Sequence, residues 1–370
     1  MAGAPGRRRS VRRRAALPAL LATKQTQPPK QHERAAEAPS PEPQADTPYR
    51  TPTMTTPVFD AAQTARVTPF AELVDALRTA ALDADAGRIE SPARLVVPLN
   101  EGGVMLSMPA SAADLAIHKL VTVCPRNRGG DLPTIQGQVS VVDPATGAPL
   151  FALDGPTVTG RRTAAVTLLA LRTFVAAAPR DVLLIGTGTQ AAHHVEALAA
   201  LFPGVRVRVK ARALAQAAAF CARLRAVLPT LEPLGGDTLP ETLDAVITAT
   251  TSATPVYDDA ARAGRLVVGV GAFTPGAAEV GARTIAGSAL YVDDPAGARH
   301  EAGDLIVAGV DWARVRSLAD ALRATVSTPA SNASPAPGAP VFFKSVGCAA
   351  WDLAACRVAR AVTSRTRACT

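Results

Sequence analysis

The chain has 370 residues and a formal net charge of +8, and 48% of its residues are hydrophobic against 19% charged, which is typical of a soluble globular protein. At roughly 150 residues per domain, this length corresponds to about two domains. No apolar run approaches the ~20 residues that a membrane-spanning helix needs. Five cysteines without paired spacing argue against a disulfide framework and against a zinc or other metal site, and we expect a reducing, cytoplasmic compartment.

Residues 1–53 form a basic, proline-rich tail. They contain ten Lys or Arg, four Asp or Glu and nine prolines, whereas the other 317 residues carry 29 basic and 27 acidic groups. Such a tail buries too little apolar surface to offset its ordering entropy, so we expect a disordered extension, or a start codon at Met54. Two alternatives are an export signal around the apolar stretch 15–22 and an arm for nucleic acid or a membrane surface. The body has no basic stripe for nucleic acid.

The first part of the body predicts a helix followed by a small, largely antiparallel sheet. Apolar residues recur at helical spacing over 70–77, with Thr68 as N-cap and Gly87 at the end of the run. The turn 144–147 lies between two extended segments and indicates a β-hairpin. An alanine-rich helix is predicted over 162–177. The predicted extended segments are 94–99, 103–109, 115–124, 138–143 and 149–153.

From Asp181 onward, strands and helices alternate, which is typical of a parallel, doubly wound α/β sheet. A linker rich in Pro, Ala and Ser is predicted over 328–340. We expect the last strand and helix, 341–360, to return to the first domain. The other predicted strands are 182–185, 205–209, 245–248, 266–270 and 289–292, and the helices are 190–201 and 213–228.

A glycine-rich turn joins the first of these strands to its helix. Gly186, Gly188 and Ala191 fit the pattern GxGxxA. In this pattern the first glycine permits a tight turn, the second lets a pyrophosphate approach the backbone, and the alanine keeps the helix close to the sheet. The helix N-terminus adds N–H donors for the phosphates. The turn therefore predicts a dinucleotide site; the alternative is an ordinary strand-to-helix turn.

The end of the second strand bears on which dinucleotide binds. An NAD enzyme places Asp or Glu about twenty residues after the glycine turn, to hold the ribose hydroxyls. This chain has no acid there and carries Lys210 and Arg212 instead, where a 2′-phosphate would lie. The missing acid and the two cations favour NADPH, with NADH as a weaker cofactor. The alternative for the two cations is a solvated strand end.

Lysine is rare, with five lysines against 34 arginines, and only three lysines lie in the body. Strand alternation places Lys119 on the same face as Ile117 and Val121. An unpaired buried ammonium costs several kcal/mol, so Lys119 needs an anion. That anion is either an internal carboxylate or the carboxylate of a substrate, and the spacing leaves both open.

Short motifs follow one another in a characteristic order along the body. They are Ala93-Arg94-Leu, Ile117-His-Lys119-Leu-Val-Thr, Pro125-Arg-Asn127, Leu132-Pro-Thr134-Ile-Gln-Gly137, Asp143-Pro-Ala-Thr-Gly147, Leu153-Asp-Gly155, Thr159-Gly-Arg-Arg162-Thr and Val341-Phe-Phe-Lys344-Ser-Val-Gly347-Cys-Ala-Ala-Trp-Asp352-Leu353. Together with the glycine turn, they resemble the ornithine cyclodeaminase and mu-crystallin family over about residues 54–360.

The resemblance implies a fold and an assembly. We expect a homodimer whose Rossmann-type NAD(P)-binding domain spans 179–327. A mixed α+β substrate and dimerisation domain is formed by both ends of the body, 54–178 with 341–370. A small amino or imino acid is expected to bind between the two domains.

The resemblance also implies roles for individual residues. Arg94 and Lys119 hold the substrate carboxylate, and Gly347 approaches the substrate. Arg162 lies beside the cofactor and the substrate. The other residues expected at the cofactor are Thr134, Gln190, Ala191, Thr250, Val268 and Val346.

One loop departs from the cyclodeaminase pattern. Members that deaminate ornithine carry an aspartate in a Gly-Gly-Asp-x-Pro-Gly-Lys-x-Glu loop, where it assists the loss of ammonia. Here Phe273 replaces that aspartate and Ala277 replaces the lysine. Phenylalanine cannot act as an acid or base, and it makes the pocket more apolar. The sequence therefore resembles the ketimine reductase branch, which reduces Δ1-pyrroline-2-carboxylate and Δ1-piperideine-2-carboxylate to proline and pipecolate.

Three alternatives to this function stay open. The first is an alanine- or opine-type dehydrogenase of the same family, acting on an open-chain keto acid and an amine. The second is an ornithine cyclodeaminase, which Phe273 disfavours. The third is a non-catalytic, crystallin-like protein that binds NADPH.

Overall fold

The computed structural model describes residues 56–324, 335–336 and 338–368. The predicted tail at 1–53 and most of the predicted linker at 328–340 lie outside the described residues. The described residues belong to one compact unit. Its described part contains a six-stranded and an eight-stranded sheet.

The six-stranded sheet is antiparallel throughout, as predicted. Its strand order is β1-β3-β4-β5-β6, with β2 paired to β3. In β4 the predicted alternation is confirmed, because Ile117, Lys119 and Val121 are buried and the residues between them are not. The strands are β1 Ile89–Glu90, β2 Leu95–Pro98, β3 Val104–Ala112, β4 Ala116–Val123, β5 Ile135–Val142 and β6 Pro149–Asp154.

Helices cover this sheet, with α10 in contact with β3, β4 and α2, and α3 in contact with β5. The predicted N-cap at Thr68 is wrong. Helix α2 follows Pro69, and Thr68 Oγ1 instead donates to Thr64 O at 2.7 Å, at the end of the short helix α1. The helices of this part are α1 Ala61–Val67, α2 Phe70–Asp85, α3 Gly155–Phe174 and α10 Ala349–Ala368, with 3-10 turns η1 Asn100–Gly102 and η2 Pro125–Asn127.

The eight-stranded sheet is parallel throughout, in the order β13-β12-β14-β11-β10-β7-β8-β9. The chain runs outward from β7 to β9 and then continues on the other side of β7 with β10. The carboxyl ends of β7 and β10 therefore form the switch point at which such sheets bind ligands. The strands are β7 Asp181–Ile185, β8 Arg206–Lys210, β9 Leu231–Pro233, β10 Ala245–Thr248, β11 Leu266–Gly269, β12 Ala289–Val292, β13 Val315–Ser317 and β14 Val341–Lys344.

Helices connect most strands of the parallel sheet, as the alternating pattern predicted, but the segments between β9 and β10 and between β10 and β11 contain no helix. Strands β7, β10, β11 and β14 are buried at every residue, and the neighbours Leu183 and Leu184 of β7 belong to two different apolar clusters. This burial on both faces explains why these four strands are mostly apolar. The helices are α4 Thr189–Leu201, α5 Leu214–Leu224, α6 Ala282–Ala286, α7 Pro295–Glu301, α8 Gly303–Val307 and α9 Leu318–Ala324, with the 3-10 turn η3 Trp312–Arg314.

The last strand corrects one expectation. Strand β14 pairs with β11 and β12 inside the parallel sheet, so the prediction that residues 341–344 belong with the first domain is wrong. All four of its residues are buried, which is typical of a central strand covered on both faces. The following helix α10 does return to the antiparallel sheet and α2. The chain thus passes from one sheet to the other between Lys344 and Ala349.

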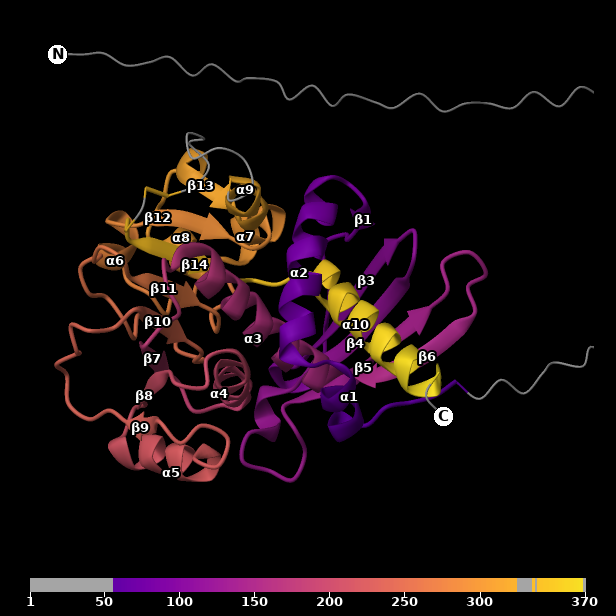
Figure 1. The fold of residues 1–370 in the computed structure, drawn as a ribbon, viewed down its shortest axis with the longest axis horizontal. Coiled ribbons are helices and arrows are strands. Elements are labelled where there is room, and N and C mark those ends of the chain that lie inside the picture. Colours follow the sequence, from indigo (N-terminus) through magenta and orange to yellow (C-terminus); the bar gives the residue numbers. More distant parts are fainter. Residues whose placement is uncertain (1–55, 325–334, 337, 369–370) are drawn as a thin grey trace, which may run out of the picture. The chain divides into compact units, whose positions relative to one another are not determined.

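Helix α3 joins the two sheets through the core. It contacts β5 of the antiparallel sheet and β11 of the parallel sheet. Figure 1 shows α2, α3 and α10 near the region where the two sheets adjoin. One apolar cluster extends from the antiparallel sheet through these helices to one face of the parallel sheet. A second, smaller cluster covers the other face. The segment that links β14 to α10 lies at this junction.

Candidate active site

The predicted dinucleotide turn lies at the carboxyl end of β7. Gly186 has a φ of +129°, and a Cβ there would lie 2.4 Å from Ala249 O, so the position requires glycine. Gly188 is the N-cap residue of α4, and a Cβ there would meet nothing within 4 Å. Beside it, Gln190 Oε1 is buried without a hydrogen-bond partner, and Ala191 is fully buried against the sheet. The open helix N-terminus, with its unpaired N–H groups, fits a pyrophosphate.

Lys210 and Arg212 lie next to this turn. The register of β7 and β8 places Lys210 opposite Ile185, directly before the glycine turn. Lys210 Nζ is 3.7 Å from Asp237 Oδ1, and because Asp237 is exposed this ion pair is weak. Arg212 is exposed. Both side chains are therefore free to meet an additional anion.

Three other residues expected at the cofactor have different surroundings. Thr250 follows β10, where a Cβ on Gly186 would lie 3.5 Å from Thr250 Cγ2, so the two are neighbours. Val268 lies within β11, and its side chain is fully buried in the apolar core, so it packs there and faces no open site. Thr134 is half-buried before β5, and its carbonyl accepts a hydrogen bond from Cys124 N at 2.8 Å. No hydrogen bond among the described residues ties Thr134 to the other predicted site residues.

Two predicted site cations share one buried carboxylate. Lys119 Nζ lies 2.6 Å from Asp352 Oδ2, and Arg162 Nε lies 3.2 Å from Asp352 Oδ1. The side chains of Lys119 and Asp352 are 2% and 0% exposed. Burial lowers the pKa of Lys119 to about 8, an effect that Asp352 opposes and Arg162 reinforces. Lys119 thus has the internal carboxylate that was one of its two predicted partners, but two cations on one carboxylate leave an excess of positive charge.

Arg94 completes this group, which we call the cation corner: Arg94, Lys119 and Arg162 with Asp352. Arg94 Nη2 donates to Val346 O at 3.0 Å and to Gly347 O at 2.6 Å.

Arg94 also pairs with Glu301 Oε2 at 3.0 Å. Burial raises the pKa of Glu301, and Arg94 opposes this rise. Gly347 lies between the two arginines, because a Cβ there would be 2.4 Å from Arg162 Nη1, and its φ is +74°. The structure therefore brings Arg94, Arg162, Val346 and Gly347 together.

Sequence reasoning gave no role to Asp352 or Glu301. A signal for Asp352 was present, because it is a charged residue within the first turn of a helix whose neighbours Trp351 and Leu353 are buried. A carboxylate in such a run needs a buried cation, and Lys119 was already predicted to be one. Glu301 ends α7 and gives no comparable signal, since charged residues are common at helix ends.

The loop that carries Phe273 follows β11. Its base is fixed, because the N–H groups of Gly271 and Ala272 donate to the buried Glu279 Oε2 at 2.5 and 2.9 Å. The other oxygen of Glu279 accepts from Thr250 N and Oγ1 at 2.6 and 2.8 Å. Phe273 itself is 46% exposed. Glu279 thus binds together the loops that follow β10 and β11, and it leaves an aromatic side chain at the surface of the second loop.

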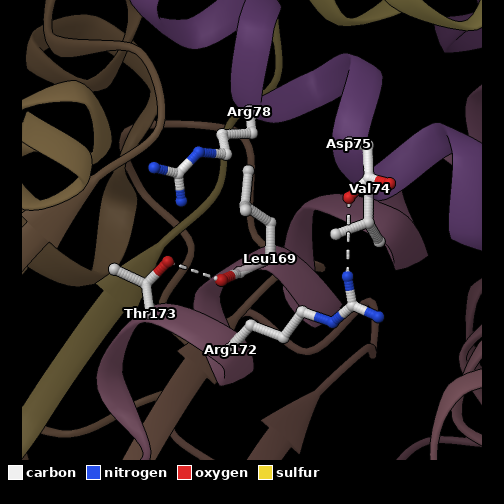
Figure 2. A pocket seen from close by; sticks show the side chains of 6 residues that line it. All are labelled: Val74, Asp75, Arg78, Leu169, Arg172 and Thr173. Carbon is white, nitrogen blue, oxygen red and sulfur yellow. Dashed lines mark hydrogen bonds and ion pairs between the residues drawn. The ribbon is translucent and has the colours of Figure 1, made fainter. Parts of the chain in front are cut away.

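Metal-binding clusters, membrane-spanning helices and cavities are further features that could indicate a function. No cluster of three or more His, Cys, Asp or Glu side chains suited to a metal is found among the described residues, and none of their helices is long and apolar enough to cross a membrane. A cavity of about 190 Å³ lies between α2 and α3, where Figure 2 shows Arg172 directed at Asp75. It shares no lining residue with the glycine turn or the cation corner, so we do not assign it to the active site.

The chain is similar in sequence and in fold to named proteins. The chain is 61% identical over 312 residues to the Delta(1)-pyrroline-2-carboxylate/Delta(1)-piperideine-2-carboxylate reductase of Azospirillum brasilense, an alignment that covers 84% of this chain and 97% of that relative. The fold of the present chain is similar to that of Thermococcus litoralis Delta(1)-pyrroline-2-carboxylate reductase in complex with NADH and L-proline. The TM-score is 0.75 at 23% identity, and the match covers 84% of this chain and 98% of that chain.

An archaeal alanine dehydrogenase dimer with bound NAD has the same fold, with a TM-score of 0.72, 23% identity and coverage of 84% and 97%. The family itself is identified by sequence, since the match extends over residues 55–366. The chain therefore belongs to the ornithine cyclodeaminase/mu-crystallin family, as its motifs predicted.

Proposed function

We propose that this protein is a nicotinamide-dependent reductase of cyclic ketimines, which converts Δ1-pyrroline-2-carboxylate and Δ1-piperideine-2-carboxylate to proline and pipecolate. The observation that carries this proposal is the charge of the cation corner, where Lys119 and Arg162 face the single carboxylate of Asp352. The excess charge suits a small substrate carboxylate. The 61% identity to a reductase named for these two imines supports the choice of substrate.

The residues of the corner would bind and orient the substrate. The substrate carboxylate is attached to the imine carbon, so a grip on the carboxylate also fixes which face of the ring meets the cofactor. The hydrogen bonds of Arg94 to its own chain use Nη2, which leaves Nε and Nη1 for the substrate. When bound, the reduced nicotinamide supplies the hydride, and the imine nitrogen takes up a proton.

The cofactor we propose is NADPH, with NADH as a weaker substitute. The support is the position of Lys210 opposite the start of the glycine turn and the exposure of Arg212. No acidic residue follows β8 at the place where an NAD enzyme holds the ribose hydroxyls. Gly186, Gly188 and the N-terminus of α4 would hold the pyrophosphate.

Phe273 separates this function from deamination. Loss of ammonia from ornithine needs an acid or base where the phenyl group stands, and the base of that loop is held by Glu279. We therefore propose reduction of a preformed ring. An aromatic side chain at this loop suits the apolar edge of a cyclic imine.

We also propose a homodimer that forms through the outer face of the antiparallel sheet. Leu95 and Leu120 lie on this face in register with Ser107 and are 61% and 39% exposed. The archaeal alanine dehydrogenase with this fold is a dimer. The substrate and dimerisation domain would be 54–178 with α10, and the nucleotide domain 179–327 with β14. The described cysteines are free thiols, which fits the cytoplasm.

The function is tested by following NADPH oxidation by absorbance. Purified protein should oxidise NADPH with each of the two cyclic imines and should form proline or pipecolate. Parallel reactions contain pyruvate with ammonia or an amine, and ornithine with NAD. Turnover with the open-chain pair but not with the imines would indicate a dehydrogenase, and release of ammonia from ornithine would indicate a cyclodeaminase. Either result would overturn the proposal.

A further inference from the structure

The segment between β14 and α10 is held from two sides. Arg94 Nη2 donates to the carbonyl oxygens of Val346 and Gly347 at 3.0 and 2.6 Å. The N–H groups of the same two residues donate to the carboxylate of Asp293, each at 2.9 Å. Asp293 therefore fixes the N–H side of the segment whose carbonyl side receives Arg94.

Asp293 is a buried carboxylate that follows β12 directly. It is 5% exposed, and it lies beside the end of β14 because Val292 is opposite Lys344. Besides the two N–H groups above, it accepts hydrogen bonds from Ser345 Oγ at 2.8 Å, Asp294 N at 2.9 Å and Trp351 Nε1 at 3.2 Å. All five donors are neutral groups. A buried charge held only by neutral donors is costly unless each donor is fixed, so this carboxylate organises the groups around it.

We propose that Asp293 is a positioning residue that sets Arg94 for the substrate carboxylate, acting through the peptide group that joins Val346 to Gly347. The inference rests on the proposed function. Arg94 comes from the segment before β2 and must be held at the far end of β14. If the Val346 carbonyl is fixed, the guanidinium loses less conformational freedom when substrate binds. Glu301 adds an ion pair to the same nitrogen, but Asp293 sets the direction of the Val346 carbonyl, because this carbonyl and the Gly347 N–H belong to one planar peptide group.

The substitution Asp293→Asn tests the acceptor character of this side chain. The amide keeps the shape of the carboxylate, but it presents an N–H₂ group to at least two of the five donors. The peptide group between Val346 and Gly347 should then reorient and weaken the hold on Arg94. Because the grip on the carboxylate acts in the ground state and the transition state alike, we expect the imine KM to rise about tenfold with kcat changed less than about threefold.

A double-substitution cycle separates positioning from general support of the fold. If Asp293 acts through Arg94, then Asp293→Asn should change kcat/KM by less than about twofold in an Arg94→Ala protein. The dissociation constant of 2′,5′-ADP, which carries only the adenosine half of the cofactor, should stay the same. Asp181→Asn is the matched control: Asp181 is also 5% exposed, accepts from Arg208 and Thr242, and lies at the amino end of β7, whereas Asp293 lies after the carboxyl end of β12. It should leave the imine KM unchanged.

Additive effects of Asp293→Asn and Arg94→Ala, or weaker 2′,5′-ADP binding, would overturn the inference and leave the proposed function intact. A wild-type protein without imine turnover would overturn the proposed function, and this inference with it. If Asp293→Asn does not fold, Ser345→Ala removes one of the five donors. That variant should show the same dependence on Arg94, with a KM change of about threefold, and an unchanged KM would contradict the proposal.

Discussion

Each of the two sheets contains a buried lysine paired with a buried aspartate, and the two pairs differ in their charge balance. In the antiparallel sheet, Lys119 Nζ lies 2.6 Å from Asp352; at the end of β14 in the parallel sheet, Lys344 Nζ lies 2.7 Å from Asp304. All four side chains are at most 2% exposed. Burial and pairing therefore do not distinguish the two lysines.

The surroundings of the two aspartates do distinguish them. The second oxygen of Asp304 accepts the N–H groups of Glu279 and Val280 at 2.6 and 2.8 Å, so Lys344 and Asp304 form a neutral, closed pair. The second oxygen of Asp352 is taken by another cation, Arg162. A charge-neutral ion pair needs no further ligand and supports the fold. A buried group with excess positive charge is neutralised only when an anion binds. Charge balance, and not burial, marks Lys119 as the functional lysine.

The largest effect is expected for the balanced pair. Lys344→Met leaves Asp304 as a fully buried carboxylate without a cation, which should lower the free energy of unfolding by about 3–5 kcal/mol. Urea unfolding followed by circular dichroism measures this change. The double variant Lys344→Met/Asp304→Asn, which removes both charges, should recover part of the loss. A single variant as stable as wild type would show that the pair is not needed.

Lys119→Met should behave differently. Asp352 keeps Arg162 as a partner, so the loss of unfolding free energy should be clearly smaller than for Lys344→Met. The substrate carboxylate loses one of its cations, which should cost about 2–5 kcal/mol in kcat/KM for the imine. Unfolding and imine turnover are measured on the same preparations. If Lys119→Met unfolds as readily as Lys344→Met, or keeps its turnover, the contrast between the two lysines is wrong.

The third lysine of the body, Lys210, extends the comparison to a half-buried site. Lys210 has only a weak contact with Asp237, and Arg212 is exposed, so Ser at both positions should leave stability unchanged. Loss of two contacts to a 2′-phosphate should raise the KM for NADPH roughly tenfold to a hundredfold, at ~1.4 kcal/mol per tenfold. The KM for NADH serves as the internal control and should change little. Equal changes for both cofactors would remove these residues from the phosphate site.

The smallest effect concerns pH. Burial lowers the pKa of Lys119 to about 8, so the side chain loses its proton as the pH rises through that value. A neutral amine does not attract a carboxylate, and kcat/KM for the imine should fall by up to about tenfold per pH unit above this point. Lys119→Met, at its lower rate, should lack this descending limb. A limb that persists in the variant would belong to the imine or to another group.

The sequence predicted the strands, helices and turns that position the site better than it predicted the contacts between the site residues. The alternation of strand and helix and the glycine turn are local patterns, and both are confirmed, as is the inward direction of Lys119 on β4. The partner of Lys119 was not predictable, because Asp352 is distant in the chain. Helix α10 is also buried on several sides, so its apolar pattern does not define which face meets β4.

The position of β14 was missed for a related reason. Chain order suggested that a strand after the linker would rejoin the first domain, but four consecutive buried residues are the pattern of a central parallel strand. Asp293 and Glu301 were missed because their roles depend on which loops meet at the junction of the two sheets. Local secondary-structure propensity carries no information about which distant loops come into contact.

Binding of the substrate carboxylate by the cation corner is tested most directly with two rings that differ only in this carboxylate. Wild-type protein with NADPH is supplied with Δ1-pyrroline-2-carboxylate or with Δ1-pyrroline, and kcat/KM is measured for each. If the cation corner binds the substrate carboxylate, removing that group should lower kcat/KM by about a hundredfold or more, and Lys119→Met should reduce this preference. Equal turnover of the two rings, or a preference that is unchanged in Lys119→Met, would contradict carboxylate binding by the cation corner.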